Sequence, residues 1–289
     1  MVEETTSDQP AWLKCTVTAE AAVLELLALL LIDLGSGGIE EDGGSIAAWF
    51  APARKSEVEE ALDLFRKGQK AQLGWAWSEV AKEDWWESWK KYFHPFRASE
   101  RLWVRPSWEE QPPPDPSMAV LVVDPGRAFG TGSHETTRLC LKLIDEALAA
   151  KPAASIFDVG SGSGILTVAA RLLGVQKALA IDIDPLAVSA TLENARMNGV
   201  AEGVLTARAD VRAVAARHPL VVCNILYQII MGIAPELVRK VEPGGTLILS
   251  GFLVNEAEGV ERMFKTLGLD VCKREEMGQW GALVFEAPL

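Results

Sequence analysis

The chain has 289 residues, 49% of them hydrophobic, which is enough to bury a sizeable core and to form two domains. Its net charge of −12 argues against strong binding to nucleic acid, and its apolar runs are too short to cross a membrane. No secretory signal opens the chain, and four scattered cysteines without metal-ligand spacing indicate a cytoplasmic protein that binds no metal, which we expect to be a monomer.

The first 80 residues predict a small α+β domain. Apolar alternation and helical periodicity predict strands and helices in the order β-α-β-β-α-β, over residues 12–17, 19–34, 38–41, 45–50, 56–67 and 75–80. This is the order of a ferredoxin-like unit. By fold analogy alone, residues 1–80 are expected to recognise the substrate.

Residues 81–117 are rich in tryptophan and end in a run of prolines. Trp85, Trp86 and Trp89 follow helical spacing on one short segment. Such a stripe serves packing more often than ligand binding, so we expect a helical linker held against a neighbouring domain. The prolines predict a loop before the second domain, which we expect to cover residues 118–289.

The loop at 124–137 is the first stretch of the second domain with a functional pattern. It reads D-P-G-R-A-F-G-T-G-S-H-E-T-T and follows an apolar strand. Gly130 allows close backbone approach to a ligand, and its neighbours Phe129 and Thr131 add an aromatic face and a hydroxyl. We therefore expect this loop to contact a cofactor.

A helix is predicted to follow the loop, over residues 134–149, with Ser133 as its N-cap. Thr137 lies in the first turn of this helix, where free backbone N–H groups point at whatever lies in front. His134 is a tempting general base, but we expect it to hold the loop instead.

Residues 154–182 form the motif around which the second domain is organised. An apolar strand ends at Asp158, glycines follow at 160, 162 and 164, and a helix leads to a second strand that ends at Asp182. Strand, glycine turn, helix and strand make half of a doubly wound nucleotide-binding unit, whose ligand lies beyond the carboxyl ends of the strands.

The glycine spacing distinguishes between cofactors. The dinucleotide fingerprint is G-x-G-x-x-G, but here Ile165 stands where its third glycine belongs. G-x-G-x-G after an acid is instead typical of class I (Rossmann-like) methyltransferases, which bind S-adenosylmethionine (AdoMet). Gly160 and Gly162 would then lie under the methionine and ribose, and the acceptor-only carboxylate of Asp182 would bind both ribose hydroxyls. Asp158, the acid before the first glycine, is expected to contact the cofactor as well.

Strands over 204–208, 220–223 and 245–250 continue the sheet, and an antiparallel hairpin over 270–274 and 282–285 closes it. Asn224 follows the fourth parallel strand, and we expect its side-chain carbonyl to accept the hydrogens of a substrate amine and aim its lone pair at the methyl group. The alternative role of Asn224 is to cap the following helix.

Motifs along most of the length resemble one family, the PrmA methyltransferases that modify ribosomal protein eleven of the large subunit in bacteria. These motifs are H-P-F-R with E-R-L-W-V-R-P-S-W (94–108), D-P-G-x-A-F-G-T-G-S-H-x-T-T (124–137), F-D-V-G-S-G-S-G-I-L (157–166), I-D-I-D-P (181–185) and N-I-L (224–226). Glu135 departs from the family, which usually has proline there.

The resemblance implies AdoMet contacts from Thr137, Gly160, Asp182 and Asn224. It also implies a ferredoxin-like substrate-recognition domain, and transfer of several methyl groups to lysine side chains and an N-terminal α-amine of the ribosomal protein.

Three other functions stay open. A lysine methyltransferase of the same lineage could act on another protein, such as a flavoprotein subunit. A module that binds AdoMet or RNA without turnover is a second alternative. A nicotinamide dehydrogenase is the third, and the glycine spacing disfavours it.

Overall fold

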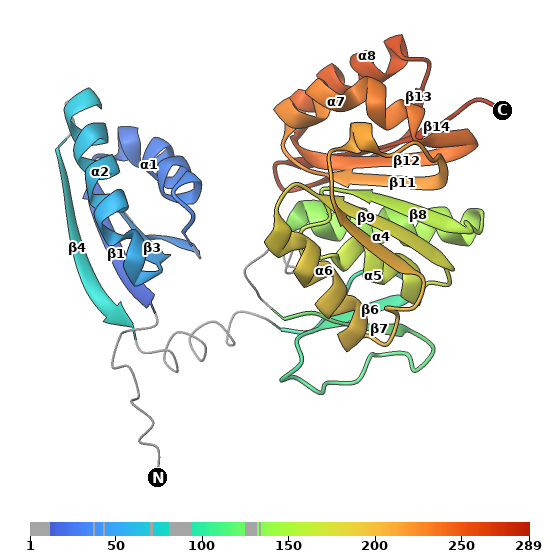
Figure 1. Cartoon of the computed structure of the whole chain (residues 1–289), viewed down its shortest axis with the longest axis horizontal. Coiled ribbons are helices and arrows are strands. Elements are labelled where there is room, and N and C mark those ends of the chain that lie inside the picture. The colour runs from blue at the N-terminus through green and yellow to red at the C-terminus, as the bar shows by residue number, and fades with distance from the viewer. Residues whose placement is uncertain are drawn as a thin grey trace. The chain divides into compact units, whose positions relative to one another are not determined.

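The protein consists of two compact units, Met1–Tyr92 and Phe93–Leu289 (Figure 1). The computed structural model describes residues 12–36, 38–42, 44–69, 72–80, 94–124, 132 and 134–289. The division falls within the predicted linker at 81–117. The prediction that this linker is helical is wrong after residue 93, because this part contains strands β5 (Phe96–Arg97) and β6 (Leu102–Arg105) of the second unit. Trp85, Trp86 and Trp89 lie outside the described residues.

The N-terminal unit has the predicted β-α-β-β-α-β order. Its elements are β1 (Trp12–Ala19), α1 (Ala21–Asp33), β2 (Ile39–Asp42), β3 (Ser45–Phe50), α2 (Lys55–Gln69) and β4 (Leu73–Val80). The strands form an antiparallel sheet in the order β2-β3-β1-β4. This element order and antiparallel pairing are those of a ferredoxin-like unit.

One face of this sheet is covered by both helices. Cys15 and Val17, two positions apart on β1, point to the same face, as the period of two of a strand requires. Leu27 of α1 and Leu62 of α2 are fully buried in the same apolar cluster. The unit therefore has a core of its own.

The described residues of the C-terminal unit form a seven-stranded sheet in the order β10-β9-β8-β11-β12-β14-β13. The strands are β8 (Ser155–Val159), β9 (Lys177–Asp182), β10 (Val204–Arg208), β11 (His218–Asn224), β12 (Val241–Leu253), β13 (Asp270–Met277) and β14 (Trp280–Glu286). The first five in this order are parallel, and β14 is antiparallel to both of its neighbours. The predicted closing hairpin is confirmed.

Helices cover both faces of the large sheet. Helices α4 (Glu135–Ala150), α5 (Ile165–Leu172) and α6 (Pro185–Met197) lie on one face, and α7 (Tyr227–Arg239) and α8 (Ala257–Thr266) on the other (Figure 1). Neighbouring strand residues serve opposite faces: Ile156 is buried with α4 and α5, and Phe157 is buried with α7 and α8. Strands buried on both faces explain why β8 and β11 are nearly continuous apolar runs.

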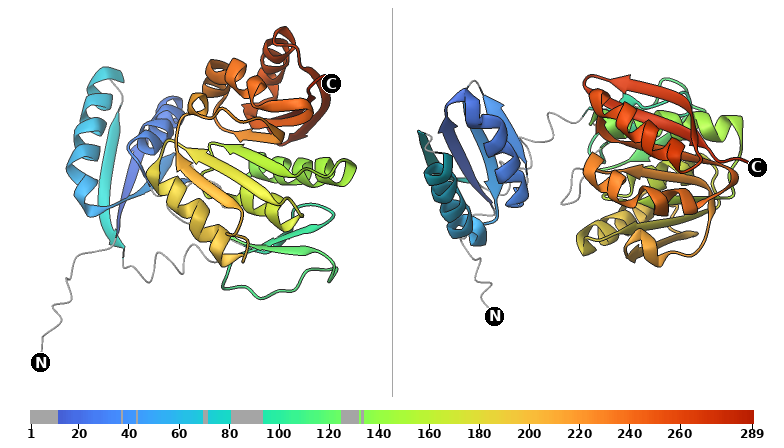
Figure 2. Two further views of the ribbon diagram at one scale, coloured as in Figure 1. Left: turned by 45° about the vertical axis from the view of Figure 1, so that its right-hand side comes forward. Right: turned by 90° about the horizontal axis from the view of Figure 1, so that it is seen from above.

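A small sheet of β5, β6 and β7 (Ala119–Val122) packs next to α5, away from α7 and α8 (Figure 2). Leu102, Val104 and Leu121 from these strands join the same apolar core as Ile165 at the start of α5. Strand β7 ends two residues before Asp124, the first residue of the stretch in which the sequence predicts cofactor contacts.

Candidate functional site

The turn between β8 and α5 excludes side chains at two of its glycines. Gly160 and Gly164 have φ values of +76° and +77°, which favour glycine because L-residues are strained there. A Cβ on Gly160 would collide with Cγ2 of Ile225, and one on Gly164 would lie 2.6 Å from Cγ2 of Thr191. The turn is therefore close-packed at these two positions, where no side chain fits.

Asp182 is held at the tip of β9 by two backbone groups. Its Oδ2 accepts a 3.0 Å hydrogen bond from Gly162 N–H, and its Oδ1 accepts a 3.0 Å bond from Asp184 N–H. A carboxylate has about four acceptor sites, so two further donors can be accommodated. The arrangement fixes the carboxylate and leaves acceptor capacity for a pair of hydroxyl groups.

Asp158 is buried one strand away, with only 1% of its surface exposed. Burial raises the pKa of this carboxyl to about 6; the hydrogen bonds from Thr167 oppose the rise in pKa, and the charge of Asp182 adds to it. Asp158 Oδ2 accepts a 2.7 Å bond from the Thr167 hydroxyl. Its buried Oδ1 has no partner among the described residues, so one acceptor atom stays available beneath the glycine turn.

The start of α4 is organised by His134 and not by Ser133. His134 is the N-cap, because its φ of −67° and ψ of 141° are extended and its Nδ1 accepts a 3.3 Å bond from Thr136 N–H. Burial lowers the pKa of His134, although Glu135 opposes this, and the neutral ring can accept. The predicted cap Ser133 lies outside the described residues. The expectation that His134 holds the loop stays a prediction, because residues 125–131 and 133 lie outside the described residues.

Thr137 presents a second buried polar atom without a partner. It is 1% exposed, and its Oγ1 has no hydrogen-bond partner among the described residues. Cys140, nearly one turn further along α4, is also buried; burial raises the pKa of its thiol, and the Asp158 carboxylate raises this pKa further. The first turns of α4 therefore lie close to Asp158.

Asn224 ends β11 and pairs in register with Ser250 of β12. The next residue, Ile225, is held between two glycines: its Cγ2 occupies the place of a Gly160 side chain, and its carbonyl oxygen occupies that of Gly251. Gly251 has a φ of +97°, which also favours glycine. The position of Asn224 is thus fixed through contacts that its own sequence neighbourhood does not reveal.

The sheet order brings most of the predicted site residues together. Because β9, β8 and β11 are adjacent, Asp182, Asp158 and Asn224 lie along one carboxyl edge, with the glycine turn after β8 between them. Thr137 joins them from α4. Phe129, Gly130 and Thr131 lie outside the described residues. Sequence reasoning missed Thr167, Ile225 and Gly251, of which only Gly251, directly after the strand predicted over 245–250, carried a usable signal.

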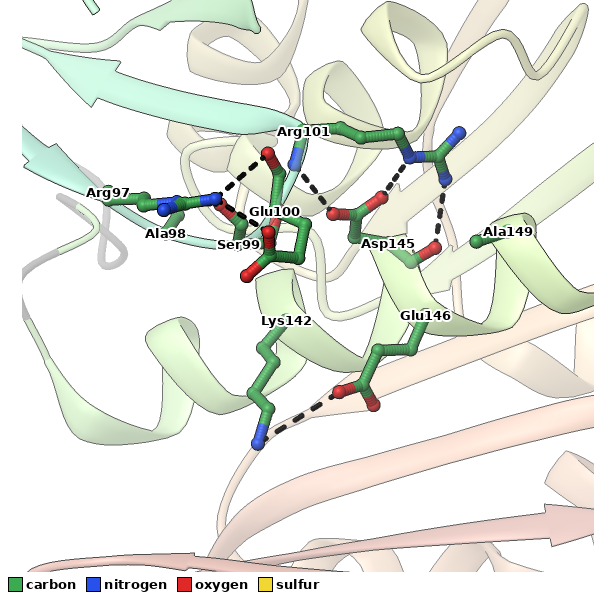
Figure 3. Close-up of a pocket in the computed structure, with 9 residues that line it drawn as sticks. All are labelled: Arg97, Ala98, Ser99, Glu100, Arg101, Lys142, Asp145, Glu146 and Ala149. Atoms are coloured by element: carbon green, nitrogen blue, oxygen red, sulfur yellow. Dashed lines mark hydrogen bonds and ion pairs between the residues drawn. The ribbon is translucent and has the colours of Figure 1, made fainter. Parts of the chain in front are cut away.

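A cavity of about 410 Å³ lies elsewhere, between the turn that joins β5 to β6 and the second half of α4 (Figure 3). Its charged side chains pair with one another: Arg101 Nε bonds Asp145 Oδ1 at 2.6 Å, and Arg97 bonds Glu100 at 2.6 Å. None of the predicted site residues lines it. The charged groups of this cavity thus stabilise the packing of the small sheet on α4.

Within the described part of the chain, no three His, Cys, Asp or Glu side chains are arranged to hold a metal ion. Among the same residues, no helix is long and apolar enough to cross a membrane.

Comparison with known proteins identifies relatives along the whole length. The ribosomal protein L11 methyltransferase (PrmA) family matches residues 38–288. The L11 methyltransferase of Pelotomaculum thermopropionicum is 36% identical over 94% of this chain and 97% of its own, and that of Syntrophotalea carbinolica is 36% identical over 95% and 97%. The crystal structure of the L11 methylase from Lactobacillus delbrueckii subsp. bulgaricus matches with a TM-score of 0.63 and 30% identity, over 68% of this chain and all of that one.

The fold agrees with these matches, since five parallel strands followed by an antiparallel hairpin form the sheet of class I AdoMet-dependent methyltransferases. By sequence and by fold, the chain belongs to the ribosomal protein L11 methyltransferase (PrmA) family.

Proposed function

We propose that this protein transfers methyl groups from AdoMet to lysine side-chain amines and the N-terminal α-amine of ribosomal protein L11. The observation that carries the proposal is the placement of two features at one edge of the sheet, on the two strands that flank β8. Asp182 holds acceptor capacity for two hydroxyls beside the glycine turn, and Asn224 stands at the end of β11 on the same edge. Membership of the family supports L11 as the substrate.

The residues present fit AdoMet. Asp182 would accept hydrogen bonds from the ribose hydroxyls, and the backbone at Gly160 and Gly162 would approach the methionine portion. Two buried oxygens without partners among the described residues, Asp158 Oδ1 and Thr137 Oγ1, stand ready for polar groups of the ligand or for water. Phe129, Gly130 and Thr131, which lie outside the described residues, are proposed as further cofactor contacts from the sequence alone.

The bound cofactor supplies the methyl group: the amine lone pair forms the new N–C bond while the C–S bond breaks, the electron pair stays on sulfur, and the amine proton passes to water. The protein contributes placement. The side-chain carbonyl of Asn224 accepts an N–H of the amine and directs its lone pair, and Ile225 keeps Asn224 in place against the glycine turn. In-line placement of this kind accounts for a large part of a transfer barrier.

Intact-mass spectrometry of unmodified L11, incubated with this protein and AdoMet, tests the proposal. Mass steps of one methyl group, rising to several additions, are the expected result, and peptide mapping then assigns them to lysines and to the α-amine. If AdoMet binds but the mass of L11 does not change, L11 is not the substrate. The related lysine methyltransferase acting on another protein, such as a flavoprotein subunit, then becomes the better assignment.

We also propose that the ferredoxin-like unit recognises L11, that one chain is sufficient for activity, and that the reaction takes place in the cytoplasm. The two units have separate cores, which supports a division of labour between recognition and catalysis. A truncated chain of residues 93–289 should bind AdoMet as the full chain does and lose L11 methylation. Full activity of the truncated chain would remove the recognition role.

A further inference from the structure

Two exposed apolar side chains lie directly after Asn224. Leu226 is 62% exposed and Ile229 is 48% exposed. Leu226 is the N-cap of α7 and Ile229 lies in its first turn, and residues three apart on a helix are surface neighbours. A single exposed leucine needs no explanation, but this pair stands at the residue that we assign to the substrate amine.

The only aromatic residue of this segment is turned elsewhere. Tyr227 is half-buried against the core that includes α7 and α8. A Cβ added to Gly259 of α8 would lie 2.8 Å from the Tyr227 hydroxyl oxygen, so this glycine makes room for the phenol between the two helices. Leu226 is therefore the exposed side chain next to Asn224, and an aliphatic surface stands there instead of an aromatic ring.

The backbone that carries Leu226 is fixed on both sides. Ile225, which precedes it, is held between Gly160 and Gly251. The carbonyl oxygen of Leu226 accepts hydrogen bonds from the N–H groups of Ile229 at 3.0 Å and Ile230 at 3.1 Å. An exposed side chain on a fixed backbone presents a constant surface to an incoming group, which a specificity contact requires.

We propose that Leu226 and Ile229 contact the methylene stem of the substrate lysine and thereby favour ε-amines over α-amines. This inference rests on the proposed function. A lysine carries its ammonium on a flexible four-carbon stem, and such stems lie along apolar surface while the polar head reaches a polar partner. Two residues of extended chain span at most about 7 Å, so Leu226 lies close enough to Asn224 to contact the stem of a lysine whose amine is held there. An N-terminal α-amine sits directly on Cα and has no stem to place there.

The test uses the full chain and unmodified L11 as substrate, with site-resolved kinetics by peptide mapping. Leu226→Gln should raise the KM for lysine methylation about tenfold, the lower end of the cost of losing an apolar contact in a specificity site. The kcat should change little, because a contact made equally in the ground state and the transition state affects KM alone. In Leu226→Gln, methylation of the α-amine and AdoMet affinity should stay as in the wild type. The apolar variant Leu226→Met should keep the wild-type KM for lysine methylation.

Leu205→Gln is the matched control, because Leu205 is 65% exposed but lies on β10, the edge strand of the sheet. Its KM should equal that of the wild type. If Leu226→Gln methylates lysines with unchanged KM, or weakens both kinds of amine or AdoMet binding equally, the stem contact is overturned while the proposed function stands. If the wild type adds no methyl group to L11, both the proposed function and the stem contact are overturned.

Discussion

The backbone N–H of Gly162 donates a 3.0 Å hydrogen bond to Oδ2 of Asp182, and so joins the turn after β8 to the tip of β9. The same carboxylate accepts a bond from Asp184 N–H through its other oxygen. The glycine turn and the proposed ribose-binding acid are therefore one unit. A change at Asp182 alters both the acceptor offered to a ligand and the anchoring of the turn.

Asp182→Asn should weaken AdoMet binding by roughly 10- to 100-fold, because hydrogen bonds to a charged group contribute about 1.5–3 kcal/mol. An amide nitrogen cannot accept the ribose hydroxyls or the Gly162 N–H. Isothermal titration with AdoMet measures the loss.

Asp184→Asn provides the control for this experiment. Asp184 is exposed and caps α6 through a 2.8 Å bond from Leu186 N–H, so its replacement affects the helix terminus and should leave AdoMet affinity near the wild-type value. Equal losses in the two variants would contradict a direct role of Asp182.

Thr137→Val should separate stability from ligand binding. The buried Thr137 hydroxyl has no partner among the described residues, so an isosteric methyl group removes a desolvated polar atom and should leave the melting temperature unchanged or raise it. AdoMet affinity should fall, since the hydroxyl is proposed to bind the ligand.

Thr136→Val, one position earlier, should behave in the opposite way. Its Oγ1 lies 2.8 Å from Nδ1 of His134, which caps α4, so this variant should melt at a lower temperature. A lower melting temperature for Thr137→Val together with unchanged AdoMet affinity would show that the Thr137 hydroxyl is structural. Thermal unfolding and titration of both variants with AdoMet decide between these roles.

The fold could be predicted where local pattern and long-range pairing agree. Strand β8, the glycine turn, α5 and β9 could be predicted because glycines at alternate positions directly after an apolar strand are typical of a nucleotide-binding turn. An acid at the end of the next apolar strand completes the pattern. The hairpin of β13 and β14 followed from the apolar run at 282–285 and the glycine-containing turn before it.

The missed features depend on contacts between distant residues. Strand β5 has two residues and β6 four, too few for a period of two to emerge from the tryptophan-rich sequence around them. The support of Asn224 comes from Gly160 and Gly251, which approach Ile225 from other strands. Helix α4 begins at an imidazole cap, where sequence rules favour the adjacent serine.

Asp158 makes the stability of the ligand-free protein depend on pH. Burial holds its pKa at about 6, above the ordinary value of 3.8, so the folded state favours the protonated form. This contribution to stability is complete below pH 3.8 and is lost as the pH rises through 6. The whole change is roughly 3 kcal/mol, from about two pKa units at about 1.36 kcal/mol each.

Asp158→Asn lacks this titration. Its free energy of unfolding, relative to the wild type, should therefore rise by about 2 kcal/mol between pH 4.5 and 7.5, whatever the constant difference between the two proteins. Urea unfolding of the ligand-free proteins across this range measures the change. Asp115→Asn is the control, because hydrogen bonds from Ser117 lower the pKa of that exposed carboxyl and place its titration below the range. Parallel pH curves for Asp158→Asn and the wild type would exclude a raised pKa.

Asn224→Ala should separate methyl transfer from cofactor binding. The alanine keeps the backbone that Ile225 anchors, so the glycine turn and most of the AdoMet affinity should remain. The amine loses the acceptor that orients its lone pair, and misplacement of a reacting group by about 1 Å costs on the order of 100-fold in rate. Single-turnover methylation of L11 at saturating AdoMet measures this step directly.

Asn198→Ala tests whether a lost asparagine lowers the rate merely by loosening the fold. The Asn198 amide bridges both backbone groups of Val122, at 2.7 Å each, and joins α6 to β7 away from the tip of β11. Its replacement should lower the melting temperature and leave the single-turnover rate intact at low temperature. The N-cap of α7 is Leu226, so the alternative capping role of Asn224 is wrong, and unchanged turnover in Asn224→Ala would leave Asn224 without a role in placing the amine. Loss of AdoMet binding together with turnover would make Asn224 a cofactor ligand without a separate role in placing the amine.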